Sequence, residues 1–251
     1  MDNKETSWGN VADWYQDLLT GDNTYQEEVI LPNLLRVLEL KDKEKILDLA
    51  CGEGFFSRAF MKEDADVTAL DISPELIAIA KIKSPSGINF ITASGDKLPF
   101  PDESFKKVVI VLALQNIENV SGAIAECSRV LSRNGELFIV LNHPAFRIPK
   151  YSLWGMDEEK KVQYRRIDAY MSESKTEINM HPGKDTKKTT VSFHRPLQLY
   201  FKVFAKNNFV VSKLEEWVSH KKSEEGSNAA PENRARKEIP MFMLVKCIKL
   251  S

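Results

Sequence analysis

Between residues 45 and 143 the chain alternates short, nearly continuous apolar runs with segments of helical pattern. The apolar runs have the length of strands and occupy residues 46–50, 66–72, 88–94, 107–114 and 136–142. Helical patterns lie between them at 55–64, 74–83 and 121–132. Runs that are apolar at almost every position are typical of strands in a sheet covered on both faces. The alternation predicts an α/β fold, with a doubly wound and mainly parallel sheet and right-handed crossovers.

The rest of the chain is less regular, and we expect it to complete a single domain over residues 1–251. The expected parts are N-terminal helices at 8–20 and 24–40 that form a lid (1–40), a core (41–143), a cap inserted after the fifth strand (144–195), and a last helix with edge strands (196–251). Two final apolar runs, 209–217 and 241–250, predict an antiparallel pair at one sheet edge and bring the strands to seven. Residues 219–238 between them are polar and charged, so we expect a mobile loop there.

Composition narrows the class of protein and its partners. With 251 residues, 43% of them hydrophobic, the chain is long enough for a full core. A formal net charge of −1 gives no basic footprint, so we expect no nucleic-acid partner. The three cysteines are far apart and lack metal-site spacing, which predicts buried thiols and no metal. A polar N-terminus and the lack of an apolar stretch of about 20 residues predict a cytoplasmic protein without membrane association.

The first apolar run stops abruptly on small residues, in the sequence K-I-L-D-L-A-C-G-E-G-F-F at 45–56. Parallel sheets bind ligands at the carboxyl ends of their strands, and the turn after the first strand is the usual place. Glycine in such a turn permits positive φ and lets backbone N–H groups approach a ligand. Gly52 and Gly54 meet that requirement, so we expect a ligand to contact this turn.

Acidic residues follow two further strands at the same predicted edge. Asp71 ends the second run, where a carboxylate can accept both hydrogen bonds from a ribose diol. Ser73 is available to cap the following helix, which leaves Asp71 for a ligand. Asp96 lies just beyond the third run and can accept a hydrogen bond from an exocyclic amine. Together the three strand ends predict a nucleoside site.

Two kinds of nucleoside ligand compete for this site. A dinucleotide motif, G-x-G-x-x-G, has a third glycine for helix packing, whereas this chain has Ser57 at that position. Glu53 would also meet a pyrophosphate with its own negative charge. A ligand with no phosphate and a cationic centre therefore suits the turn better, and a nicotinamide-dependent oxidoreductase is the alternative.

Several stretches of the sequence resemble class I S-adenosylmethionine-dependent methyltransferases of the small-molecule, methyltransferase-11-like type. Residues 48–54 resemble the D-x-G-x-G-x-G signature of that family, with Ala50 where the first glycine is usual. Asp71 matches the acidic ribose position and residues 95–100 match the adenine segment. The stretch R-V-L-S-R-N-G-E-L-F-I-V resembles a further family passage. The resemblance covers mainly the predicted core and implies a Rossmann-like sheet with an antiparallel last strand.

The resemblance also implies where S-adenosylmethionine, and its product S-adenosylhomocysteine, would bind. The backbone of residues 50–54 would hold the methionine part, Asp71 the ribose hydroxyls and Asp96 the adenine amine. Tyr15 and Trp14, on the predicted N-terminal helix, would close over the cofactor or pack in the core. The implied cofactor residues are Asp48, Ala50, Cys51, Gly52, Gly54, Asp71, Ile72 (against adenine), Asp96, Lys97 (through its backbone), Ala113 and Asn116 (beside the methyl donor), and Tyr15.

The sequence indicates the methyl acceptor less specifically than it indicates the cofactor. After the fourth run the chain reads L-A-L-Q-N-I, without the [D/N/S]-P-P-[Y/F/W] motif of methyltransferases that act on DNA bases or glutamine. With the near-neutral charge, this favours a small-molecule acceptor under the 144–195 cap, methylated on oxygen or nitrogen. His143 leaves the fifth strand and His194 returns from the cap, so both are candidate general bases, or else structural histidines.

Two arginines of the cap region have two interpretations. Arg147 and Arg195 would bind a carboxylate on the substrate, because a guanidinium matches a carboxylate with two hydrogen bonds. Otherwise they would pair with Glu215 or Glu216.

The cap also carries aromatic residues and a hairpin pattern. Trp154, Tyr164 and Tyr170 would stack on a flat acceptor, or pack beneath the cap. A hairpin predicted at 175–193 suits a homodimer contact. In a second alternative, the chain is a non-catalytic cofactor-binding protein and this hairpin is its docking arm.

Overall fold

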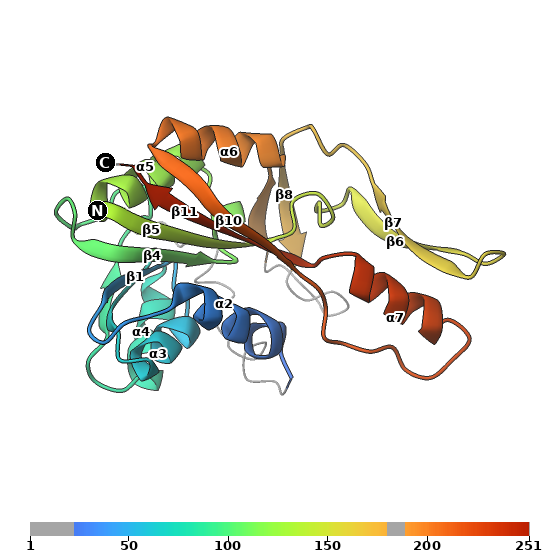
Figure 1. Ribbon diagram of the computed structural model, residues 1–251, viewed down its shortest axis with the longest axis horizontal. Coiled ribbons are helices and arrows are strands. Elements are labelled where there is room, and N and C mark those ends of the chain that lie inside the picture. Colours follow the sequence, from blue (N-terminus) through green and yellow to red (C-terminus); the bar gives the residue numbers. More distant parts are fainter. Residues whose placement is uncertain (1–22, 180–188, 251) are drawn as a thin grey trace.

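The computed structural model describes residues 23–179 and 189–250, and its centre is a seven-stranded sheet (Figure 1). Its five parallel strands are β1 (Lys45–Leu49), β2 (Asp66–Asp71), β3 (Asn89–Thr92), β4 (Phe105–Val111) and β5 (Leu131–Asn142). β11 (Phe242–Lys249) runs antiparallel to both β5 and β10 (Phe209–Trp217), and the strand order is β10-β11-β5-β4-β1-β2-β3. The predicted Rossmann-like, mainly parallel sheet with an antiparallel last strand is confirmed. That last strand lies inside the sheet, and β10 forms the edge.

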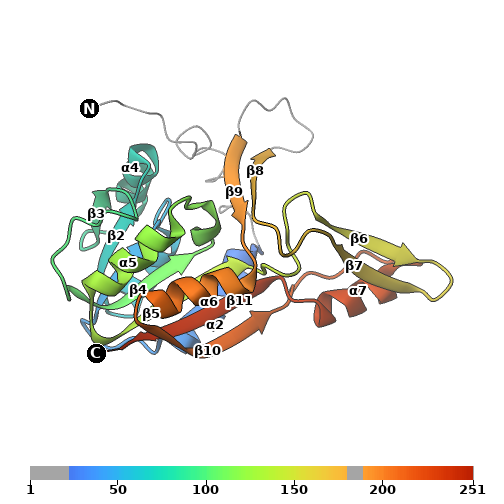
Figure 2. The ribbon, with the colours of Figure 1, turned by 90° about the horizontal axis from the view of Figure 1, so that it is seen from above.

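Helices cover both faces of the sheet (Figures 1 and 2). Those on one face are α2 (Leu31–Leu38), α3 (Phe55–Lys62) and α4 (Pro74–Lys83), and those on the other are α5 (Val120–Val130) and α6 (Leu197–Lys206). Successive side chains of a strand point to opposite faces, so Ile46 and Leu47 are both fully buried in different clusters. None of the helices within 23–179 and 189–250 is long and apolar enough to cross a bilayer.

The N-terminal part is only partly comparable with the prediction. The helix expected at 24–40 is a π-helical turn, η2 (Gln26–Ile30), followed by α2. Pro32 lies in the first turn of α2 and lacks the N–H that a continuous helix would use there. The helix predicted at 8–20, with Trp14 and Tyr15, lies outside the described residues.

The cap between β5 and α6 contains two hairpins (Figure 2). β8 (Ser174–Asn179) and β9 (Thr189–His194) form the one predicted at 175–193, although residues 180–188 lie outside the described part of the chain. The homodimer contact expected at that hairpin stays a prediction. β6 (Ser152–Asp157) and β7 (Val162–Ile167) form a second hairpin that the sequence did not indicate, because neither strand contains a fully buried residue.

The prediction of a loop over 219–238 is wrong for its second half. Residues Ala229–Glu238 form α7, which packs against β7 and lies beside the β6–β7 hairpin in Figure 1. Pro231 is tolerated because it lies in the first turn, where backbone N–H groups have no partner within the helix. The buried residues of α7 are Pro231 and Ala235, so its apolar face was too small to recognise. The cap therefore combines segments from two distant parts of the chain.

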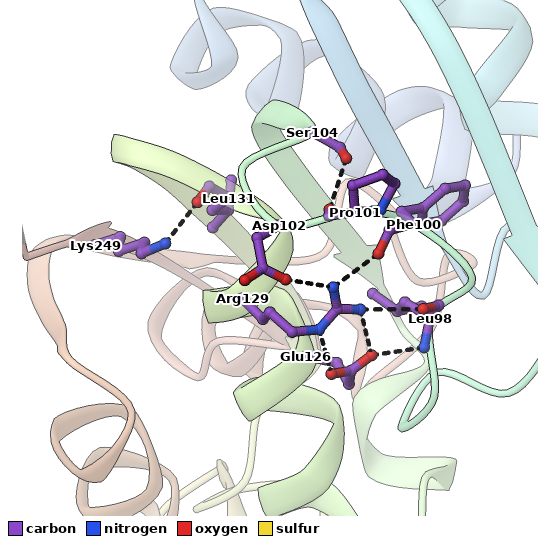
Figure 3. Close-up of polar contacts among 9 residues, drawn as sticks. All are labelled: Leu98, Phe100, Pro101, Asp102, Ser104, Glu126, Arg129, Leu131 and Lys249. Atoms are coloured by element: carbon purple, nitrogen blue, oxygen red, sulfur yellow. Dashed lines mark hydrogen bonds and ion pairs between the residues drawn. The ribbon is translucent and has the colours of Figure 1, made fainter.

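Arg129, near the end of α5, clamps the loop that follows β3 (Figure 3). Its guanidinium donates hydrogen bonds to the carbonyl oxygens of Leu98 (3.0 Å) and Phe100 (2.7 Å). It also donates to the carboxylates of Asp102 (2.9 Å) and Glu126 (2.7 and 2.8 Å). Glu126 in turn accepts the Leu98 N–H at 2.7 Å. This arginine opens the R-V-L stretch of the sequence, and it fixes the loop expected to meet adenine against α5.

We expect Arg129→Met to lower the free energy of unfolding by about 3 kcal/mol, because two backbone carbonyls and two carboxylates lose their donor. Urea unfolding of the wild type and the variant measures this difference. Arg133→Met is the matched control, since the Arg133 side chain is 78% exposed and should contribute no more than about 0.5 kcal/mol. Equal unfolding midpoints for all three proteins would contradict the clamp.

Candidate functional site

The turn between β1 and α3 adopts the left-handed backbone that its small residues predict. φ is 62° at Ala50, 58° at Gly52 and 81° at Gly54. A Cβ on Gly54 would lie 3.1 Å from the Phe90 ring and 3.3 Å from the Ala80 Cβ, so Gly54 is required by packing as well as by φ. Ala50 accepts the same backbone at a cost of about 1–2 kcal/mol. The chain thus brings bare backbone to the carboxyl end of β1.

Asp71 connects this turn to β2. Its Oδ2 accepts the N–H of Gly52 at 2.9 Å, and its Oδ1 accepts the N–H of Ser73 at 2.9 Å. Burial raises the pKa of Asp71, while hydrogen bonds from backbone N–H groups, that of Ser73 first, lower it. Ser73 caps α4 by accepting the Leu76 N–H, as expected. Each carboxylate oxygen of Asp71 keeps a further lone pair that a ribose hydroxyl could use.

Asp48 supports the turn from within β1. It is 2% exposed, and its Oδ2 accepts a hydrogen bond from the Ser57 hydroxyl at 2.5 Å. Burial raises the pKa of Asp48 to about 7, and the neighbouring charge of Asp71 raises it as well, against the hydrogen bond from Ser57. Ser57, at the position where a dinucleotide motif has glycine, therefore has a structural role that the sequence did not reveal.

Glu53 differs from the sequence-based expectation. It is 2% exposed and forms ion pairs with Arg58 (2.7 Å) and Lys83 (2.6 Å). Its charge is compensated within the protein, so repulsion of a pyrophosphate by Glu53 is no longer an argument against a dinucleotide.

Asp96 lies in the loop after β3, at the same edge of the sheet. Its Oδ1 accepts the Ser94 hydroxyl at 2.5 Å, and its Oδ2 accepts the Asn119 amide at 2.9 Å. These two hydrogen bonds hold the pKa of Asp96 below its usual value. Lys97 follows in the same tight turn, with its N–H bonded to the Ser94 carbonyl. Asn119 also caps α5, so it joins this loop to the helix that carries Arg129.

The turn after β4 contains Ala113 and Asn116. Leu112 has a left-handed φ of 52°, and its carbonyl accepts the side-chain amides of Gln115 (2.7 Å) and Asn116 (3.3 Å). Arg195, returning from β9, donates to the carbonyls of Leu114, Ile117 and Glu118, at 3.5, 2.8 and 2.8 Å. Arg195 thus fixes this turn and is not available to a substrate carboxylate.

The two candidate histidines have different surroundings. The Nε2 of His143 is 2.7 Å from the Glu216 carboxylate and its Nδ1 accepts the Ala145 N–H, so both ring nitrogens are used. Burial lowers the pKa of His143, although Glu216 opposes that shift. The Nε2 of His194 donates to the Tyr170 carbonyl at 2.7 Å, which leaves its Nδ1 as the ring nitrogen that can accept a hydrogen bond. Neither histidine lines the two cavities that lie between β5 and the cap.

Two cavities lie between β5 and the cap. The larger, about 410 Å³, begins at Asn142 and is bordered by the 147–152 loop, by Arg165 of β7 and by residues 176–179 of β8. The smaller, about 60 Å³, is bordered by Tyr25 and Trp154 among others, and shares Arg147 and Arg165 with the larger one.

The cap residues named from the sequence serve different purposes. Trp154 lies under the Arg165 guanidinium at 5.1 Å, and Tyr164 is 47% exposed. The Tyr170 hydroxyl accepts the Leu197 N–H at 3.0 Å, so Tyr170 joins the cap to α6. Glu215 pairs with Arg36, and Glu216 with His143, so neither pairs with Arg147 or Arg195.

The residues at the sheet edge fit an adenosyl ligand without phosphate. Ile72, next to Asp71, is 49% exposed, as a platform for a flat base would be. The Oε1 of Gln115, in the turn after β4, is buried and has no hydrogen-bond partner within the described residues. The strand order also differs from the six parallel strands of the dinucleotide fold, because β11 is antiparallel and lies between β5 and β10.

Comparison with known sequences finds similarity to methyltransferases. Residues 47–139 match a family model described as a methyltransferase domain. A demethylmenaquinone methyltransferase from Tropheryma whipplei is 35% identical over 123 residues, 47% of this chain and 51% of the relative. A ubiquinone/menaquinone biosynthesis C-methyltransferase from Shewanella pealeana is 31% identical over 160 residues, 57% of this chain and 62% of the relative. The chain spans about half the length of the first of these relatives and less than two thirds of the second.

Solved structures agree over more of the chain. An S-adenosylmethionine-dependent methyltransferase from Mesorhizobium loti has a TM-score of 0.69 and 26% identity, covering 86% of this chain and 96% of that one. The glycopeptide N-methyltransferase MtfA, solved with sinefungin, shares the fold with a TM-score of 0.60 and 16% identity, covering 89% of this chain and 86% of that one. The matched region, residues 47–139, is therefore a methyltransferase domain, and the glycine turn and the strand order make the chain similar to S-adenosylmethionine-dependent methyltransferases.

Proposed function

We propose that this chain transfers the methyl group of S-adenosylmethionine to a small-molecule acceptor held under the cap. The observation that carries the proposal is a cavity of about 410 Å³ that begins at the carboxyl end of β5, the same sheet edge that carries the glycine turn. Cavities of about 300–1,000 Å³ are typical of small-ligand sites. The net charge of −1 gives no support to a nucleic-acid acceptor.

Each strand end would hold one part of the cofactor. The backbone of residues 50–54 would bind its amino-acid part, and Asp71 its ribose hydroxyls. Ile72, Asp96 and Lys97 would surround the adenine, and Ala113 and Asn116 would line the transferred methyl group. When bound, the cofactor supplies an electrophilic methyl group on a positively charged sulfur.

The remaining task of the chain is to position the acceptor and accept its proton. Methyl transfer is an in-line displacement, so holding the acceptor atom in line supplies most of the catalysis. We propose His194 as the general base, because its Nε2 donates to the Tyr170 carbonyl and its Nδ1 is the ring nitrogen that remains to accept a proton. His194 does not itself line the cavity but lies in β9, which pairs with the β8 strand that borders it, so the acceptor would have to reach past β8 residues to contact it. The hydrogen bonds of Arg195 fix the turn after β4, next to β9. His143, with both nitrogens used, would anchor the start of the cap on β10.

The acceptor atom is proposed to be oxygen or nitrogen. The relatives named above are quinone methyltransferases, and one is named a C-methyltransferase, so an activated ring carbon is the second candidate. The same base would serve both, since removing a proton from a ring hydroxyl raises the electron density on that oxygen and on the neighbouring ring carbons.

A methyl-release assay tests the function directly. Purified protein, S-adenosylmethionine and pooled small metabolites should form S-adenosylhomocysteine faster than protein without metabolites. Tight cofactor binding with no release across all pools would favour the non-catalytic alternative.

We expect Asp71→Ala to weaken S-adenosylhomocysteine binding at least a hundredfold, because two charge-assisted hydrogen bonds of about 1.5 kcal/mol or more each are lost. Isothermal titration calorimetry measures the change, with Asp66→Asn at the exposed start of the same strand as the control. Asp71→Asn, which keeps one acceptor oxygen for the Gly52 N–H, should retain the fold and still bind weakly. Undiminished affinity in both Asp71 variants would contradict the ribose assignment.

We expect His194→Gln to lower kcat by about 10²–10⁴-fold while cofactor affinity is unchanged. Glutamine can still donate a hydrogen bond to the Tyr170 carbonyl but is not a base, so the variant separates the two roles of the ring. Steady-state kinetics with the acceptor found above measures the effect. Normal turnover of His194→Gln would show that His194 is not the base.

A further inference from the structure

Arg147 and Arg165 form a pair of cations on the wall shared by the two cap cavities. Arg147 follows the end of β5, and Arg165 lies in β7, 18 positions later in the sequence. Within residues 23–179 and 189–250, neither forms an ion pair with a carboxylate, whereas most arginines near the sheet do, including Arg36, Arg58 and Arg129. Arg195 also lacks a carboxylate partner but donates to three backbone carbonyls, whereas the half-buried guanidinium of Arg147 donates to none of the described residues, so its position needs a physical reason.

Arg147 carries its charge without compensation. Its side chain is half-buried, and no hydrogen bond from its guanidinium is formed to the described residues. Burial lowers the pKa of Arg147, and burial together with the charge of Arg147 lowers the pKa of Arg165. Two like charges in a partly dehydrated wall cost free energy unless an anion binds between them.

Arg165, by contrast, is held rigidly. Its Nε donates to the Phe146 carbonyl at 2.9 Å and its Nη2 to the Ser152 hydroxyl at 2.7 Å, while its plane lies over the Trp154 ring. None of these bonds uses Nη1. Because these contacts already fix the guanidinium, it can bind a planar anion through Nη1 with little further loss of side-chain entropy.

The side chains around the larger cavity carry a net positive charge. Arg147, Lys150 and Arg165 line it, and Glu177 is the single acidic residue among its described lining residues. The sequence suggested Arg195 as the partner of Arg147, but Arg195 is occupied by three backbone carbonyls.

We propose that Arg147 and Arg165 bind an oxyanion, a carboxylate or a phosphate, carried by the methyl acceptor. The inference rests on the proposed function only in assigning this group to the acceptor; the anion site itself depends on the two arginines. The acceptor would then enter with its acidic group toward β7 and its reacting end toward the end of β5.

Binding of simple probes tests this site without knowing the acceptor. Ligand-observed NMR titrations would use benzoate, its neutral analogue benzamide, and inorganic phosphate, each with S-adenosylhomocysteine present. We expect wild-type protein to bind benzoate or phosphate at least tenfold more tightly than benzamide, and the stronger of the two identifies the kind of oxyanion. No preference for either anion over benzamide would overturn the proposal.

Variants assign the binding to the arginines. Arg147→Gln should weaken anion binding at least tenfold and leave benzamide binding unchanged, and Arg147→Lys should retain part of the affinity. Arg133→Gln, near the exposed start of β5, should bind like the wild type. Because Arg147→Gln removes an uncompensated charge, its Tm should be no lower than that of the wild type, so a loss of binding is not a loss of fold. Unchanged anion affinity in Arg147→Gln would overturn the proposal.

Failure of the two proposals can be told apart. If S-adenosylhomocysteine does not bind but the anions bind through Arg147, the proposed function fails and the anion site stands. If S-adenosylhomocysteine binds and the anions do not, the anion site fails and the methyltransferase function is unaffected.

Discussion

The hydrogen bond between the Gly52 N–H and the buried Asp71 carboxylate holds the ligand end of the sheet together. It joins the turn after β1 to the end of β2, so two strand ends become one rigid unit. Burial alone would drive Asp71 toward its neutral form, and the backbone N–H groups that it accepts oppose that tendency. Gly52 can present its N–H in this direction because its φ is 58°, a conformation that is costly for residues with a side chain. The glycine turn is thus required for this bond as well as for access to a ligand.

Further polar contacts extend this unit across the sheet edge. Asp48 supports the turn through Ser57, and Asp96 joins the loop after β3 to Asn119 and α5. Arg129 then fixes the rest of that loop. Sites that rest on such a connected set of contacts are preorganised, because the side chains that touch the ligand are themselves held by neighbours.

The cap is stabilised differently from the core. Its β6–β7 hairpin and α7 have few fully buried residues, and long polar side chains such as Arg195 join it to the core. A cap built in this way can vary in sequence while the sheet stays the same, which suits the region that we propose binds the acceptor. The uncompensated charge of Arg147 fits that division, because a cost in stability at one position is acceptable where it serves binding.

The sequence by itself determined the sheet, the order of the strands along the chain from β1 to β5, and the small and acidic residues at the sheet edge where we propose that the cofactor binds. These features depend on local patterns: apolar runs, a small-residue turn, and acidic residues at strand ends. The sequence also predicted that Ser73 caps α4, because a cap residue lies within three positions of the N–H that it accepts. Only the tertiary structure decided that α7 and the β6–β7 hairpin form one cap, that Arg195 binds backbone carbonyls, and that Glu53 is already paired. The physical reason is that half-exposed cap elements lack a clear hydrophobic period, and the partner of a long charged side chain depends on which distant groups the fold brings within its reach.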